Sequence, residues 1–445
     1  MARGNGLGDA YTATLGRLRA QKGNKSELGL KVLMWVLYSE RPLRAEELCH
    51  ALAVEIGSMD LDQNNIPALR TLLSSCLGLV TVEASSSTVR LVHFTLQEHL
   101  LSDLSLFHSP HSTIAEVCLT YLNFGSVRDL SPTLRSAPAT LPLLEYASVH
   151  WGKHTKIGMT EIVKMLALRL LDRFDQHISA QLLLLNFKKH NRSSPHFRGR
   201  SGPRGFTGLH AVAFLGISEI VAALSEMEEW NVNATDCTGR TALIWAARTG
   251  HEEVVKVLLK REGINPDQAD SIHGQTALAW AAEMGHLGVA KVFLQRKDIN
   301  PDLADTGFGR TPLLWAAKNG YSGVVEMLLE RGDVNPEHVD TFYGQTPLSL
   351  AAKQGHKEVV MLLLARDVVD PNRADTTTGR TPLSWAAYGG RVGVVKLLLE
   401  RQDVHTTKPD NEDQTPLLLA LSRGHHEVAR ILRDYANFHT ASRGV

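Results

Sequence analysis

The chain has 445 residues, enough for two or three domains or for one domain and a repeat array. Its 47 Lys and Arg balance 47 Asp and Glu, so no overall charge favours nucleic acid or a membrane surface. The four cysteines are far apart and form no C-x-x-C pair, which favours a reduced, intracellular chain over a disulfide framework or a zinc site. The N-terminus, MARGNGLGDAYTATLG, has no apolar core of signal-peptide length, and the sequence has no run of 18 apolar residues, so we expect no membrane segment.

Residues 1–125 predict a helical domain with a β-hairpin. The stretches SELGLKVLMWVLYSE, RPLRAEELCHALAV and IPALRTLLSSCLGL each have the apolar pattern of a helix. LVTVE and TVRLVHF then flank ASSS as two hairpin strands. TLQEHLLSDL predicts a further helix, opened by a capping box of Thr95 and Glu98. Three helices followed by a hairpin are the order of a winged helix, so we expect a winged-helix-like α+β domain.

Residues 126–204 are expected to form a helical linker that ends in a basic tether. The stretch FKKHNRSSPHFRGRSGPRG, residues 187–205, has six Lys or Arg and no acid. Its Ser, Gly and Pro are typical of a flexible connection, and its charge would also suit nuclear localisation or nucleic-acid contact. The third N-terminal helix is a weaker DNA-binding candidate, because Arg70 is its one basic residue.

The C-terminal half repeats one phrase seven times at steps of 34 or 35 residues. A Thr suited to capping a helix is followed nine residues later by a Gly suited to ending it. In four copies Pro takes the first helical position. A second helix then carries an apolar stripe, and an extended turn or hairpin follows. The Thr residues are Thr207, Thr241, Thr276, Thr311, Thr346, Thr381 and Thr415.

Paired alanines in the first helices, such as Ala316 and Ala317, indicate how the copies pack. Their small side chains let neighbouring helices approach to about 8–10 Å. One copy has too little apolar surface to fold alone, so we expect the copies to stack around a continuous core.

These residues closely resemble the ankyrin repeat, with its pattern T-P-L-H-x-A-A-x-x-G-H, V-V-x-x-L-L and an Asn-containing hairpin. The resemblance covers 205–437 and leaves 438–445 as a tail. It implies a mainly α fold: an ankyrin-repeat solenoid of about seven repeats behind the winged-helix-like domain and the helical linker. The 35-residue period adds two residues to the usual repeat, and we expect them in the hairpin.

Two departures from the ankyrin pattern concern its core. The pattern's His survives only as His210, so we expect packing to replace the hydrogen bonds which that His makes in other repeats. Trp takes the next position in four copies, where core filling is a better interpretation than a ligand-stacking ladder. These residues are Trp245, Trp280, Trp315 and Trp385.

Acids and histidines that recur once per repeat predict structural roles. The side chains of Asp270, Asp305, Asp340 and Asp375 suit turn capping better than calcium binding. Histidines one repeat apart are too widely spaced to share a metal. His150 and His154 stand four residues apart, but no third ligand is nearby. Without a nucleophile, zinc-protease or dinucleotide motif, we expect no enzyme activity, cofactor, metal or small-molecule substrate.

The ankyrin resemblance implies that a partner contacts the hairpin tips and the residues before each helix-ending Gly. The tips include His273, Phe308 and Tyr343, of which the two aromatic residues would be natural anchors. The arginines before the repeat Thr would engage an extended acidic segment by bidentate pairs. Ordinary solvated tips are the alternative. The remaining candidates are Arg248, Met284, Lys318, Lys353 and Tyr388 before the Gly, and Arg240, Arg310 and Arg380 before the Thr.

A second resemblance covers about residues 39–156. SERPLRAEELCHALAV, LVHFTLQEHLL, STIAEVCLTYLNF and PLLEYASVHWGKHTK are similar to the region between the NACHT nucleotide-binding domain and the ankyrin array of fungal NLR-like proteins. That family's phosphate-binding loop, G-x-x-x-x-G-K-[ST], has no match here; GNKS at 23–26 has Asn in place of the second Gly. The family's NTPase step is therefore not carried over, and either the chain is a short form or a partner supplies the switch.

The sequence thus predicts a non-catalytic scaffold or regulatory adaptor that binds an unidentified protein through its repeats, most simply in the cytoplasm. A nuclear transcription co-regulator that acts through residues 187–205 or the winged helix is the alternative. A hydrolase or NTPase remnant is a third possibility, which the missing loop disfavours.

Overall fold

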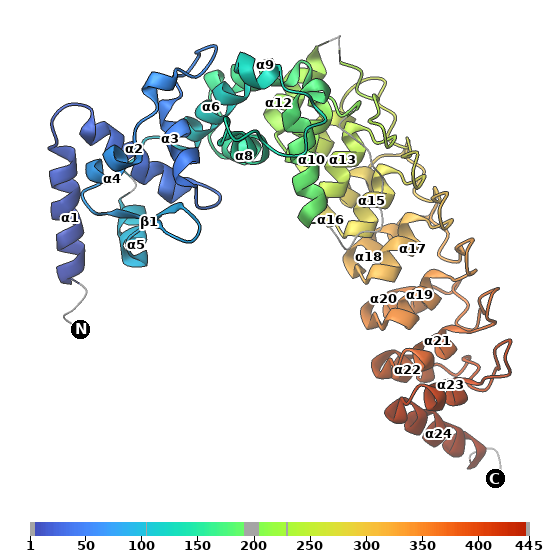
Figure 1. Ribbon diagram of the computed structural model, residues 1–445. Helices are drawn as coiled ribbons and strands as arrows, with labels where there is room; N and C mark the ends of the chain where they lie inside the picture. The colour runs from blue at the N-terminus through green and yellow to red at the C-terminus, as the bar shows by residue number, and fades with distance from the viewer. Residues whose placement is uncertain (1–4, 104, 191–203, 228–229, 442–445) are drawn as a thin grey trace. The chain divides into compact units, whose positions relative to one another are not determined.

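The computed structural model describes residues 5–103, 105–190, 204–227 and 230–441. The chain divides into two compact units, Met1–Trp230 and Asn231–Val445. Helices form nearly all the regular structure, and the described residues contain one sheet of two strands (Figure 1). The expected mainly α fold class is confirmed.

The first unit begins with a small helical domain that carries a β-hairpin. The strands pair antiparallel, with Val80 opposite Leu91. The three predicted helices precede the hairpin and the predicted fourth follows it, in the order expected for a winged helix. In chain order the elements are α2 (Lys25–Tyr38), α3 (Ala45–Ala53), the 3-10 helix η1 (Gln63–Asn65), α4 (Leu69–Ser75), β1 (Val80–Glu83), β2 (Thr88–Leu91) and α5 (Phe94–Ser102).

Two features of this domain differ from the sequence expectation. A helix that was not predicted, α1 (Asn5–Arg19), packs against α2 and α5. The capping box of Thr95 and Glu98 was wrong, because α5 begins one residue before Thr95. His93 is its N-cap, and the ring Nδ1 accepts a hydrogen bond of 3.2 Å from the Thr95 N–H.

Gly29 allows α2 and α4 to cross closely. A Cβ atom at this position would lie 2.7 Å from the Ser75 carbonyl oxygen, closer than real Cβ atoms approach. We expect Gly29→Ala to destabilise the first unit by about 1–3 kcal/mol, although Ala is the better helix former. A Cβ at Gly16 in α1 would meet no atom within 4 Å, so Gly16→Ala is the matched control. Urea unfolding of both variants tests this, and equal stabilisation by both would contradict it.

The rest of the first unit is a layer of helices that includes the first predicted repeat. α6 packs on α8 and α9, and α11 packs on α8, α9 and η2. A Cβ at Gly208, the first residue of α11, would lie 2.5 Å from the Leu171 carbonyl oxygen, so the absent side chain allows α9 close access. The elements are α6 (Pro110–Leu122), α7 (Gly125–Arg128), α8 (Leu144–Ile157), α9 (Glu161–Leu171), η2 (Phe174–Gln176), α10 (Ile178–His190), α11 (Gly208–Leu215) and α12 (Ser218–Glu226).

This layer holds buried histidines whose hydrogen bonds fix the neutral ring. His177 Nε2–H donates to the Leu122 carbonyl oxygen at 3.0 Å, and its Nδ1 accepts from the Ser179 N–H at 3.1 Å. His154 lies between the Tyr146 hydroxyl and the His111 ring, each 2.9 Å away. Burial lowers the pKa of His177 to about 4 and, with the charges of neighbouring histidines and Lys153, that of His154 to about 3.

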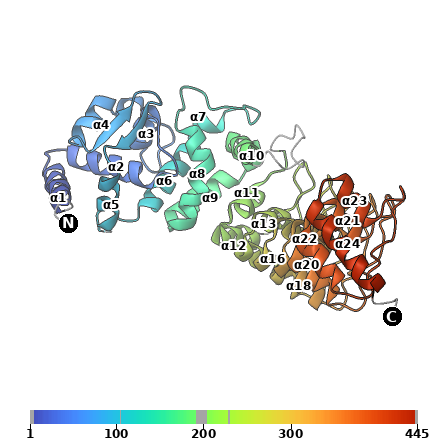
Figure 2. The same cartoon turned by 90° about the horizontal axis from the view of Figure 1, so that it is seen from below.

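The second unit stacks six helix pairs. Each first helix packs on the first helix of the next pair, and the second helices form a parallel row (Figures 1 and 2). The first helices are α13 (Ala242–Thr249), α15 (Ala277–Met284), α17 (Pro312–Asn319), α19 (Pro347–Gln354), α21 (Pro382–Tyr388) and α23 (Pro416–Ser422). The second helices are α14 (Glu252–Leu259), α16 (Leu287–Leu294), α18 (Ser322–Glu330), α20 (Lys357–Leu364), α22 (Val392–Leu399) and α24 (His426–Ala441).

The first helices begin where the sequence predicted, directly after the repeat Thr. Thr311 caps α17, its hydroxyl accepting from the Leu314 N–H, and the other five first helices begin in the same way. Gly320 ends α17 with a φ of +81°, and a Cβ there would also meet the His356 ring at 2.4 Å. The paired alanines and the four Trp side chains are buried, so core filling is the role of Trp.

Candidate functional site

The segment between the end of each second helix and the next repeat Thr projects as a loop, here called a finger, that a buried Asp holds together. Asp305 Oδ1 accepts from the Phe308 N–H at 2.5 Å, and its Oδ2 accepts from the Trp315 indole N–H at 2.8 Å. Backbone bonds link one finger to the next, as from the Thr341 N–H to the Phe308 carbonyl at 2.8 Å. The predicted turn-capping role of the aspartates is confirmed, and each finger has a fixed shape.

The indole bond also corrects an expectation about the missing pattern His. Packing alone does not replace its hydrogen bonds, because four Trp indoles donate to the finger Asp of their own repeat. In two repeats a serine hydroxyl takes the place of His and pairs with the capping Thr hydroxyl, as Ser384 does with Thr381 at 3.0 Å.

Two of the arginines before the repeat Thr, Arg240 and Arg310, are buried, and Arg380 is half-buried. Each faces an Asp of the next repeat, which argues against their expected role in binding an acidic segment. Arg310 is 4% exposed and donates to Asp340 of the next repeat, with Nη2 3.1 Å from Oδ2. Arg380 donates to Asp410 at 2.8 Å, and Arg240 lies 3.6 Å from Asp270. Each guanidinium also covers a Trp ring, at 4.9 Å for Arg310 and Trp315. These arginines join repeats to one another.

The other expected partner-binding residues keep some exposure, apart from Arg248. Arg248 is 6% exposed, and its guanidinium lies 4.5 Å from the Trp280 ring centre. Tyr343 is exposed. His273, Met284, Phe308, Lys318, Lys353 and Tyr388 are half-buried, as is Arg380.

The finger tips expose an apolar patch that the sequence interpretation located only in part. Phe342 is 60% exposed, more than its neighbour Tyr343 at 37%, and it was not among the expected residues. The rings of Phe308 and Phe342, on adjacent fingers, pack edge-to-face with their centres 6.1 Å apart. Ile272, on the finger before, is also exposed. We call Ile272, Phe308, Phe342 and Tyr343 the finger patch.

A row of cations follows the ends of the first helices. Lys318 and Lys353 occupy the same position in their repeats, Tyr388 stands there in the next repeat, and Arg423 stands one residue further along in the repeat after that. Each cation lies over an aromatic ring: Lys318 Nζ is 4.5 Å from the Trp315 ring centre, Lys353 Nζ 4.0 Å from Trp385, and Arg423 Cζ 4.0 Å from Tyr388. We call Lys318, Lys353 and Arg423 the basic row.

The following repeat fixes the backbone of this row. His356 Nε2–H donates to the Lys318 carbonyl at 3.1 Å, and Arg391 Nε–H donates to the Lys353 carbonyl at 3.0 Å. His425 does the same for Tyr388. The histidines that recur once per repeat therefore join repeats, and no group of three potential metal ligands occurs in the described residues.

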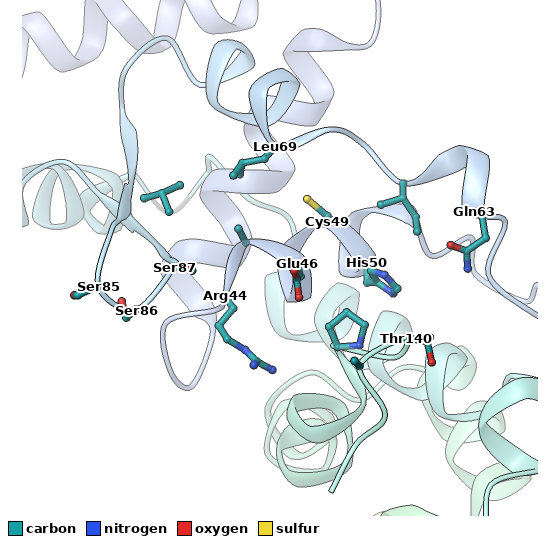
Figure 3. A pocket seen from close by; sticks show the side chains of 15 residues that line it. Arg44, Glu46, Cys49, His50, Gln63, Leu69, Ser85, Ser86, Ser87 and Thr140 are labelled. Carbon is teal, nitrogen blue, oxygen red and sulfur yellow. The ribbon is translucent and has the colours of Figure 1, made fainter.

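The first unit contains a separate pocket of about 970 Å³ beside α3 (Figure 3). Arg44, Cys49 and His50 line one side, and Ser86 at the hairpin turn and Thr140 line others. Burial raises the pKa of the Cys49 thiol, so the thiolate is disfavoured. His50 Nδ1 lies 3.2 Å from the Tyr121 hydroxyl, and among the described residues no hydrogen bond joins its ring to Cys49. Cys49 and His50 are therefore not arranged as a nucleophile and its base.

Two further expectations concern α4 and the basic tether. α4 carries Arg70 as its one basic residue. Most of the basic tether, 191–203, lies outside the described residues. Within the part of the chain that the structure describes, no helix is long and apolar enough to span a membrane.

Two protein families match the chain. The model for ankyrin repeats matches residues 155–270, 262–340, 297–375, 331–410 and 365–442, more than half of the sequence. The chain therefore belongs to the ankyrin-repeat family. The winged helix domain of GPI inositol-deacylase matches residues 17–115, which confirms the expected winged helix.

Two solved structures of other proteins resemble about half of the chain. The crystal structure of the ankyrin repeat domain of Bcl-3, a member of the IkappaB protein family, has 25% identity and a TM-score of 0.45, covering 51% of this chain and 99% of that one. The human ASB11 ankyrin repeat domain has 24% identity and a TM-score of 0.43, covering 50% of this chain and 96% of that one. No curated protein sequence matches the chain.

Proposed function

We propose that the chain is a non-catalytic scaffold or regulatory adaptor that binds a partner protein through the finger patch and the basic row. The observation that carries this is the continuity of the two surfaces. Lys353 Nζ lies 5.6 Å from the centre of the Tyr343 ring as well as over Trp385, and Phe308 packs against Trp315, over which Lys318 lies. Exposed aromatic side chains are enriched at protein interfaces, and cations beside them give a partner of opposite charge a preferred place to bind.

The rigidity of this surface supports the same proposal. Each finger is held by a buried Asp and by backbone bonds to its neighbours, so the backbone that carries the aromatic residues loses little freedom on binding. The winged-helix unit would pass the binding event to other components, as the resemblance to NLR-like proteins implies. The proposed place of action is the cytoplasm, and the nuclear co-regulator stays the alternative.

Affinity capture of the full chain from native cell extract, with mass spectrometry, tests the binding surface. We expect Phe342→Ser/Tyr343→Ser to lose the main captured protein by about tenfold or more, because these side chains would be the buried anchors. Met361→Ser/Val368→Ser is the matched control, because it removes two exposed apolar side chains from the α20 region. Equal capture by the wild type and both variants would rule out the finger patch.

A further inference from the structure

We infer that the partner segment is an extended acidic peptide whose carboxylates pair with Lys318 and Lys353, an inference that rests on the proposed function. The buried arginines cannot accept such a segment, since Asp side chains of this chain already occupy them. The two lysines are different. Among the described residues, no carboxylate lies within ion-pair distance of either Nζ atom, nor of the Arg423 guanidinium.

The lysines carry a desolvation cost that a carboxylate would offset. Burial, reinforced by the charge of Arg310, lowers the pKa of Lys318 although Glu283, Asp340 and Asp305 oppose this. Burial lowers the pKa of Lys353 in the same way, with Asp375 opposing it. The ammonium groups therefore sit partly out of water against indole faces, where an incoming anion is attracted more strongly than at a fully hydrated lysine.

The carboxylates around the two lysines already have hydrogen-bond partners. Glu283 Oε2 accepts from the Gln275 Nε2–H at 2.7 Å. Asp305, Asp340 and Asp375 are buried, and they already accept hydrogen bonds from the backbone and from Trp or Arg side chains. These carboxylates contact Arg and Trp side chains inside the stack of repeats. The ammonium groups of Lys318 and Lys353 thus keep the capacity to pair with a carboxylate from outside the chain.

The spacing of the row defines the register of the peptide. Neighbouring first helices pack at about 10 Å. A peptide in the extended polyproline II conformation advances about 3.1 Å per residue with about three residues per turn, so every third side chain points to the same face. Three residues of peptide therefore span one repeat. Lys318 and Lys353 stand in consecutive repeats, and Arg423 stands two repeats further on, past Tyr388. A glutamate at every third position can meet all three cations in either chain direction, and the side chains between can contact the finger patch.

Fluorescence anisotropy with the labelled peptide (Glu-Thr-Val)4 and the full chain tests this. We expect the peptide to bind and its Kd to rise about tenfold in Lys318→Gln/Lys353→Gln. Lys291→Gln/Lys396→Gln is the matched control, because it removes the same charge from exposed positions on α16 and α22 and should leave Kd unchanged. A peptide of equal composition with its glutamates contiguous should bind more weakly, and (Lys-Thr-Val)4 should not bind.

Several results would overturn the inference. They are absence of peptide binding, equal Kd values for the wild type and Lys318→Gln/Lys353→Gln, and tighter binding of single-stranded oligothymidylate than of the peptide. Partner capture that depends on Phe342 and Tyr343 is a separate measurement. If that capture holds while the peptide fails, the proposed function stands and only the chemistry assigned to the partner is wrong.

Discussion

Asp340→Ala should lower the unfolding free energy of the second unit by about 3–5 kcal/mol, the cost of breaking a buried ion pair. The Asp340 side chain is fully buried and receives Arg310 Nε–H and Nη2–H at 3.3 and 3.1 Å. Its other oxygen accepts from the backbone N–H groups of Tyr343 and Gln345. The variant would leave a buried guanidinium without its carboxylate and a finger without its cap.

Urea unfolding followed by Trp fluorescence measures this loss, since Trp315 lies beneath Arg310. Asp333→Ala is the matched control: Asp333 pairs with Arg331 but its side chain is 52% exposed, so the effect should be small. The double variant Arg310→Met/Asp340→Ala should recover part of the loss, because it removes the unpaired charge. Similar unfolding free energies for Asp340→Ala and Asp333→Ala would contradict the structural role of the pair.

The first unit should lose stability steeply as the pH falls below about 6.5. The pKa of His177 is lowered to about 4 in the fold, from 6.5 in the unfolded chain, and that of His154 to about 3. Between these values the unfolded chain binds more protons, so stability present above pH 6.5 is lost as the pH falls. Each histidine contributes a slope of about 1.4 kcal/mol per pH unit.

The hydrogen bonds of His177 explain why protonation is unfavourable. A second ring proton would lie on Nδ1, which faces the Ser179 N–H, so two donors would meet in a buried place. His177→Gln should therefore reduce the pH dependence of unfolding by about one proton between pH 6.5 and 4.5. His108→Gln, at an exposed position, should not change it. Urea unfolding across this pH range, with equal slopes in both variants, would show that His177 titrates normally.

The repeat array was predictable because its signals are local. The Thr cap, the Gly with positive φ and the paired alanines each act within one helix or one turn, so their spacing in the sequence is sufficient. The winged helix was predictable for the same reason, since its hairpin turn ASSS separates two alternating strands.

The arginine contacts were missed because they cross from one repeat to the next. Arg240, Arg310 and Arg380 look exposed when each repeat is considered alone. The signal was a constant offset: an Asp stands 30 residues after each of them, and the three ion pairs join those residues. Phe342 was missed for another reason. The tip was taken as the residue directly before the finger Gly, but the residue before that one is more exposed.

The contacts between consecutive repeats of the second unit affect how such a chain can change in length. Bonds between neighbouring repeats run in both directions, as when Arg310 donates forward to Asp340 and His356 donates back to the Lys318 carbonyl. Successive fingers have equivalent aspartates. Asp375 caps its finger as Asp340 caps the preceding one. Excision of residues 311–345 would offer Arg310 the carboxylate of Asp375 in place of Asp340. An array of this kind can lose a repeat while the residues on either side of the deletion still offer each other an Arg–Asp ion pair.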